Sequence, residues 1–146
     1  MFSPNAVIQG SYGGPRGVVY CNTSSNYTYF SANPTGTQWT AATTRPQLTD
    51  LTKGLYINKS DIGSDVFMLI GGNMKSISTD GGANWATSTL GEYTLTDLIY
   101  VDSNWYAIGM NGTKRFLLQN TASTFDQSNK ILDLPDYSRQ VIKINI

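Results

Sequence analysis

One turn pattern occurs three times along the chain at a nearly constant spacing. The complete copy runs from Ser78 to Trp85 and has the form Ser/Thr-x-Asp-x-Gly-x-x-Trp. An earlier copy ends at Trp39, with Asn in place of Asp and one extra residue, and a weaker copy ends at Phe125. Sequence repeats of about 40–45 residues are typical of β folds built from four-stranded units. The spacing therefore predicts a chain made of three such units.

Short β-type segments separated by turn residues fill the space between these turns. They recur at intervals of about 8–12 residues, as expected of all-β folds, and apolar residues at helical spacing are nearly absent. The strongest segments cover residues 66–70 and 105–108. Each runs into a two-residue hairpin loop, which we predict at Gly72-Asn73 and at Asn111-Gly112.

These features predict one all-β domain over residues 1–146, a small propeller-like array of three four-stranded blades. The expected repeats cover residues 1–47, 48–94 and 95–134, and a closing segment at 135–146 follows, with a last strand at 141–146. Ordinary propellers have about four to eight blades. The three repeats could close as an unusually small ring, share a ring with further copies, or pack on another protein.

The turn residues are predicted to shape the chain rather than to bind a ligand. A short carboxylate such as Asp80 can accept hydrogen bonds from backbone N–H groups of its own loop, and the hydroxyl of Ser78 can do the same. Gly82 supplies a position where a positive φ costs little, and Trp85 buries a large apolar area between neighbouring sheets. The predicted turn residues are Ser31, Asn33, Gly36, Trp39, Ser78, Asp80, Gly82, Trp85, Asn120 and Phe125.

These turns resemble the Asp box, the repeat of sialidases, related glycosidases and photosystem-assembly factors. The resemblance implies blade-type β repeats with one such turn at the rim of each blade. It does not extend to sialidase activity, which needs three clustered arginines, a Tyr–Glu nucleophile pair and an acidic Asp. Glu92 is the only glutamate, and the arginines are scattered at Arg16, Arg45, Arg115 and Arg139.

The composition argues against several classes of function. The chain has no histidine and one cysteine, Cys21, in an apolar segment, so zinc chemistry, a thiol nucleophile and an internal disulfide are not expected. Ten basic residues balance ten acidic ones, which gives no electrostatic basis for binding nucleic acid or a membrane. We therefore expect no enzymatic activity, no cofactor and no metal. A secretory signal is not expected either.

The C-terminal segment, residues 137–146, resembles the closing strand of many bacteriophage fibre and other virion proteins, which often end in a Tyr/Ile-Ile-Lys-Ile type run. Only 14 % of the residues are charged, which favours a protein embedded in a larger assembly. Together these features predict a non-enzymatic virion component of a bacteriophage. It would be a capsid decoration or cement protein, or a small tail or fibre subunit, and its partners would be other virion proteins or further copies of the chain.

Two other functions remain open from the sequence. A carbohydrate-binding module, for example the receptor-binding part of a fibre, could stack sugars on Trp105, Tyr27 and Tyr137. A glycoside hydrolase fragment would need two carboxylates at a suitable separation. Most aspartates of the chain lie in turn contexts, where Asp is expected for backbone reasons.

Overall fold

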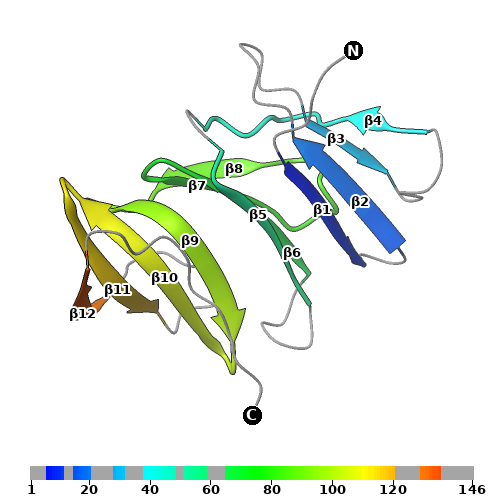
Figure 1. Ribbon diagram of the computed structural model, residues 1–146. Coiled ribbons are helices and arrows are strands. Elements are labelled where there is room, and N and C mark those ends of the chain that lie inside the picture. The colour runs from blue at the N-terminus through cyan, green and yellow to red at the C-terminus, as the bar shows by residue number, and fades with distance from the viewer. Residues whose placement is uncertain are drawn as a thin grey trace. The chain divides into compact units, whose positions relative to one another are not determined.

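The described part of the chain is built of β-strands, which confirms the all-β prediction (Figure 1). The computed structural model describes residues 6–11, 15–20, 28–31, 38–48, 51–58, 65–120 and 129–135, with the backbone alone at 6–11, 15–20 and 129. Within these residues, twelve strands form three antiparallel sheets of four strands each. The chain divides into two compact units, residues 1–88 and 89–146.

The first sheet of the N-terminal unit contains its first four strands in sequence order. They are β1 (Ala6–Ser11), β2 (Pro15–Tyr20), β3 (Thr28–Ser31) and β4 (Thr40–Ala41). Val7 pairs with Val19 between β1 and β2, and Val19 in turn pairs with Tyr29 of β3. The outer strand β4 is short, and both of its residues are exposed.

The second sheet of this unit has the same up-and-down order. Its strands are β5 (Lys53–Ile57), β6 (Val66–Gly71), β7 (Met74–Ser78) and β8 (Ala86–Thr89). Every residue of β6 is buried, because its Val-Phe-Met-Leu-Ile-Gly sequence packs on both faces of the sheet. The first strands of the two sheets, β1 and β5, lie side by side (Figure 1).

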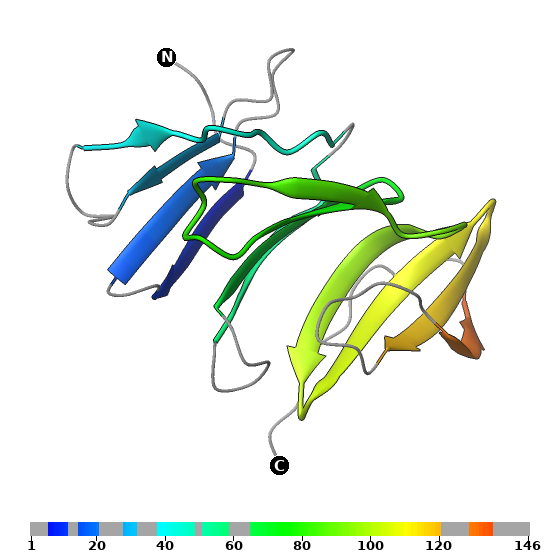
Figure 2. The same ribbon diagram turned by 180° about the vertical axis from the view of Figure 1, so that it is seen from behind.

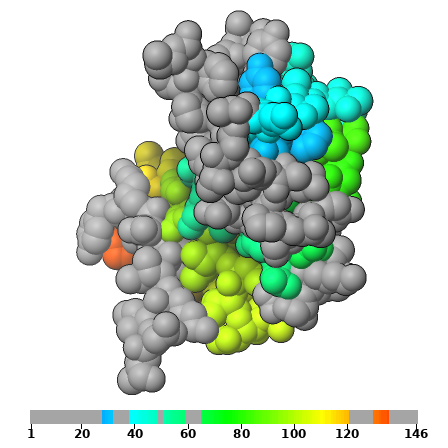
Figure 3. All heavy atoms as spheres, turned by 90° about the vertical axis from the view of Figure 1, so that its right-hand side faces the viewer, coloured from blue at the N-terminus to red at the C-terminus, as the bar shows by residue number. Residues whose placement is uncertain are grey.

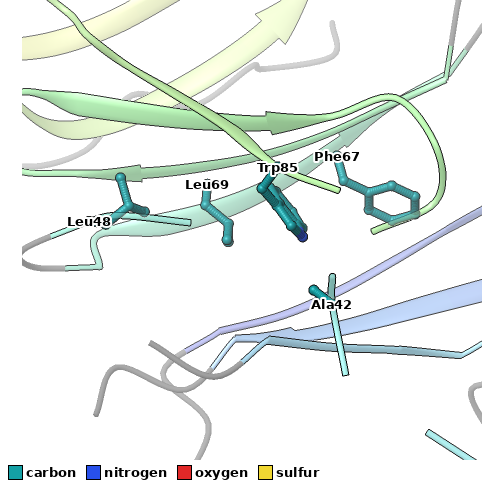
Figure 4. Close-up of a cluster of buried hydrophobic side chains, with 5 residues drawn as sticks. All are labelled: Ala42, Leu48, Phe67, Leu69 and Trp85. Atoms are coloured by element: carbon teal, nitrogen blue, oxygen red, sulfur yellow. The ribbon is translucent and has the colours of Figure 1, made fainter. Parts of the chain in front are cut away.

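The hydrophobic core of the N-terminal unit contains residues from both of its sheets. Phe67 and Leu69 of β6 form a buried cluster with Ala42, Leu48 and Trp85, which come from loops (Figure 4). Four partly buried side chains pack against this cluster: Phe30, Leu51, Tyr56 and Met74. Trp85, which ends the complete turn pattern, is therefore part of the core.

The C-terminal unit contains the third sheet, in the spatial order β12-β11-β10-β9. Its strands are β9 (Thr94–Val101), β10 (Asn104–Asn111), β11 (Lys114–Asn120) and β12 (Asn129–Leu134). Trp105, Leu98, Ala107 and Leu118 are fully buried. Leu98 and Leu118 both pair with Ala107, so these small and large side chains share one face of the sheet.

One predicted hairpin loop lies one residue away from its expected place. Gly72-Asn73 joins β6 to β7 as predicted, with Gly71 paired to Met74. In the C-terminal unit Asn111 is still paired, with Lys114, so the loop is Gly112-Thr113 rather than Asn111-Gly112. The physical reason is that Gly112 has φ 62°, and the glycine occupies the first loop position, where a positive φ is required.

Candidate functional site

The turn between β7 and β8 is held by side chains that bond to their own loop. Asp80 Oδ1 accepts hydrogen bonds from the Ser78 hydroxyl at 2.8 Å and from the Asn84 backbone N–H at 2.9 Å. Its other oxygen, Oδ2, accepts from Asn84 Nδ2 at 2.8 Å. The Ser78 hydroxyl oxygen in turn accepts from the Gly82 N–H at 2.8 Å. The side chains of Ser78 and Asp80 thus accept hydrogen bonds from backbone N–H groups of the loop, which have no partner in a neighbouring strand.

Gly82 and Trp85 complete this turn. Gly82 has φ 98°, a conformation that side-chain-bearing residues rarely adopt. The Gly82 carbonyl accepts a hydrogen bond from the Trp85 indole Nε1 at 2.9 Å. Because the polar edge of the indole is satisfied inside the turn, the rest of the ring can enter the apolar cluster, and Trp85 is only 6 % exposed.

The hydrogen bonds of the turn also set the ionisation of Asp80. Partial burial raises the pKa of this carboxyl, but the hydrogen bonds from the backbone and side chain of Asn84, from Ser78 and from the backbone of Ala83 lower it more. The net pKa of Asp80 lies below the ordinary value of 3.8. Asp80 is therefore a carboxylate at neutral pH, and its oxygens accept hydrogen bonds from residues of its own loop.

The segment between β4 and β5 is bonded to this turn, which the sequence pattern does not predict. The Trp85 N–H donates to the Thr44 hydroxyl at 2.8 Å, and the Thr43 N–H donates to the Ala83 carbonyl at 2.8 Å. Figure 2 shows residues 42–48 running from β4 toward the second sheet, and Figure 3 shows atoms of residues 38–48 at the surface, in cyan. No pattern in the threonine-rich run 40–44 identifies Thr44 as the acceptor.

A second set of hydrogen bonds lies one step further along the same segment. The Gln47 N–H donates to the Thr87 hydroxyl of β8 at 3.0 Å. The Thr87 hydroxyl also bonds the Ser76 hydroxyl of β7 at 2.9 Å. The turn and the strand that follows it therefore tie the first sheet of the unit to the second, which is a structural role.

The two incomplete copies of the pattern begin in the third strands of their sheets. The first copy begins at Ser31, the last residue of β3, and the third begins within β11. Ser31 is buried and donates to the Gln38 carbonyl at 2.7 Å, and Trp39 is half-buried. Asn120 ends β11. The other predicted turn residues, Asn33, Gly36 and Phe125, lie outside the described residues.

The structure corrects the prediction that Trp105 stacks on sugars. Trp105 is 0 % exposed, and its ring packs against Tyr100 with the centroids 4.9 Å apart. At the start of β10 the buried Trp105 and Ala107 alternate with the half-buried Asn104 and Tyr106, so the Trp105 ring points to the buried face. The sequence shows the alternation but does not show which face is covered. The other two candidates for sugar stacking, Tyr27 and Tyr137, lie outside the described residues.

Within the described ranges, no group of three or more His, Cys, Asp or Glu side chains could hold a metal ion. The same residues include no helix that is long and apolar enough to cross a membrane. Comparisons with protein-family models, with curated proteins and with solved structures found no match for this chain.

Substitution of Asp80 measures what the turn contributes. We expect Asp80→Ala to lower the free energy of unfolding by about 1–3 kcal/mol, because Asn84 and Ser78 lose their acceptor. Asp80→Asn keeps one side-chain oxygen, as the first and third copies do, and should cost less. Chemical denaturation at neutral pH measures both losses, and equal losses would show that the retained oxygen contributes nothing.

The stability of the native chain should depend on pH differently from the stability of Asp80→Asn. The carboxylate of Asp80 stabilises the fold above the ordinary pKa of 3.8, and this contribution is lost as the pH falls through the lower pKa of the folded state. The native chain should therefore lose more stability than Asp80→Asn between about pH 5 and pH 2.5. Parallel stability curves for the two proteins would rule out a role for the charge.

Proposed function

We propose that the chain is a non-enzymatic structural protein whose three sheets are the blades of a small propeller-like array. Each sheet runs up and down in sequence order, and in each the turn pattern begins in the third strand. In the N-terminal unit the first strands, β1 and β5, are neighbours. Most residues of the fourth strands β4, β8 and β12 are exposed, which suits strands at the outer rim of blades.

The observation that carries this proposal is the use of the turn's polar groups. The Asp80 carboxylate, the Ser78 hydroxyl and the Thr44 hydroxyl are all engaged in hydrogen bonds inside the N-terminal unit. A site that binds substrate directs such groups outward, whereas a turn that shapes the chain directs them inward. The one complete motif of the sequence thus serves the fold.

We infer further that the chain is a component of a bacteriophage virion, as a capsid decoration or cement protein or as a small tail or fibre subunit. Support comes from the fibre-like C-terminal segment and from the low fraction of charged residues. The outer strands β4 and β8 carry only Thr, Ser and Ala. Uncharged edges of this kind suit a protein that is held among neighbours, because isolated proteins usually protect such edges with charge. The partners are other virion proteins or further copies of the chain.

Mass spectrometry of purified particles from the source phage tests this proposal. We expect the chain to co-purify with the particles at a fixed copy number through a density gradient and a high-salt wash. A fixed ratio to the major capsid protein would favour decoration, whereas a low ratio to the tail proteins would favour a tail subunit. Presence in the infected-cell lysate without presence in the particles would overturn the proposal.

A further inference from the structure

The outer strand of the third sheet differs from the outer strands of the other two. β12 lies at the end of its sheet, and within the described residues it pairs with β11 alone. It carries Ile131 and Leu132, which are 48 % and 50 % exposed and are the two exposed large hydrophobic residues of the described part. An edge strand with exposed apolar side chains is a site for pairing with another strand.

Two charged residues flank this apolar pair and lie on the same face of the sheet. The pairing of β11 with β12 shifts by one residue, so Leu117 faces Leu132 but Leu118 faces Lys130. In a regular strand, side chains three residues apart point to opposite faces of the sheet. The irregularity instead places Lys130 and Asp133 on the same face. Lys130 Nζ lies 2.8 Å from Asp133 Oδ1 and 5.0 Å from the centre of the Phe116 ring.

This arrangement has the symmetry of a surface that can pair with itself. The order along β12 is basic, apolar, apolar, acidic, from Lys130 to Asp133. When two such strands run antiparallel about a twofold axis centred on the apolar pair, each Lys130 lies opposite Asp133 of the other copy. Opposite charges across a strand pair are favourable and like charges are unfavourable. The charge order therefore fits a second copy in the antiparallel orientation and disfavours the parallel one.

We propose that two copies of the chain associate through their β12 edges, joining their third sheets into one continuous antiparallel sheet. Main-chain hydrogen bonds supply the attraction, Ile131 and Leu132 supply the apolar centre, and the two cross-strand Lys130–Asp133 pairs fix the register. The contact is isologous, so it closes at two copies. A contact between two short strands buries less surface than stable interfaces do, which bury at least about 1,200 Å². The dimer should therefore dissociate in dilute solution. This proposal does not depend on the virion function.

The experiment reverses one charge at a time and then mixes the products. Lys130→Asp leaves two acidic residues on β12, and Asp133→Lys leaves two basic ones. In either homodimer, like charges then face each other twice, so sedimentation velocity over a concentration series should show self-association weakened at least about tenfold relative to the native chain. An equimolar mixture of the two variants restores both opposite-charge pairs across the contact, and we expect its association to return to the native strength.

The mixture separates a contact between copies from the ion pair within one strand. Each single variant lacks the internal pair, and mixing cannot restore it, so recovery must come from the cross-strand pairs. Glu92→Lys provides the matched control, because Glu92 is exposed in a turn and its variant has the same net charge as Asp133→Lys. Mixed with Lys130→Asp it restores only one of the two pairs and should associate more weakly. A monomeric native chain at every concentration, or identical behaviour of the two mixtures, would overturn the proposal.

Discussion

Replacement of Trp85 by alanine is expected to lower the free energy of unfolding by about 3–5 kcal/mol, the cost of deleting a large buried aromatic side chain. Trp85 lies in the cluster with Ala42, Leu48, Phe67 and Leu69, so its removal opens a cavity in the core of the N-terminal unit. A loss of this size is a large fraction of the stability of an ordinary domain, which is about 5–15 kcal/mol. Urea denaturation followed by circular dichroism measures it without depending on tryptophan fluorescence.

Two further substitutions show which part of Trp85 matters. Trp85→Phe keeps most of the apolar area but loses the indole hydrogen bond to the Gly82 carbonyl, so it should cost clearly less than alanine. Trp39→Ala removes the half-buried tryptophan of the first copy and should also cost less, because it gives up less buried area. If Trp39→Ala were as damaging as Trp85→Ala, the core would not be centred on the complete turn.

The second large effect is expected at Trp105. Trp105→Ala should also lower the free energy of unfolding by about 3–5 kcal/mol, because a fully buried ring that packs on Tyr100 is deleted. A surface platform for sugars would behave differently, since exposed side chains usually change stability by less than about 0.5 kcal/mol when truncated. Thermal or urea unfolding of the purified variant distinguishes these outcomes.

Leu132→Ala is the matched control for Trp105→Ala. Leu132 lies in the same sheet but is half exposed, so its truncation should have a much smaller effect in dilute solution. A Trp105→Ala protein that keeps native stability would contradict the buried position of this ring. It would also return Trp105 to the candidates for ligand binding.

The sequence predicts the turn well because its determinants are local. Asp80, Gly82 and Trp85 lie within six residues, and each acts on a neighbour in its own loop, so residue type and spacing carry the information. The all-β class follows for the same reason, from short segments and frequent turn residues. The predicted loop Asn111-Gly112 was wrong by one residue. Gly112 can take either position of a two-residue loop, and only the strand register decides which one it occupies.

What the sequence does not predict depends on contacts between distant segments. Thr44 bonds Trp85 across 41 positions, and a threonine in a threonine-rich run carries no mark of such a partner. The burial of Trp105 depends on which face of its sheet is covered, and strand alternation alone does not fix that face. The bulge that aligns Lys130 with Asp133 is likewise a property of two paired strands.

The hydrogen bonds between residues 43–47 and residues 83–87 affect how the chain folds. Thr44 leaves the ribosome well before Trp85, so the segment between β4 and β5 cannot form these hydrogen bonds until residues 83–87 have been made. Contacts of such long sequence separation slow folding, because the loop that they close must be ordered first. We therefore expect residues 43–47 to form their native hydrogen bonds late, together with the turn between β7 and β8.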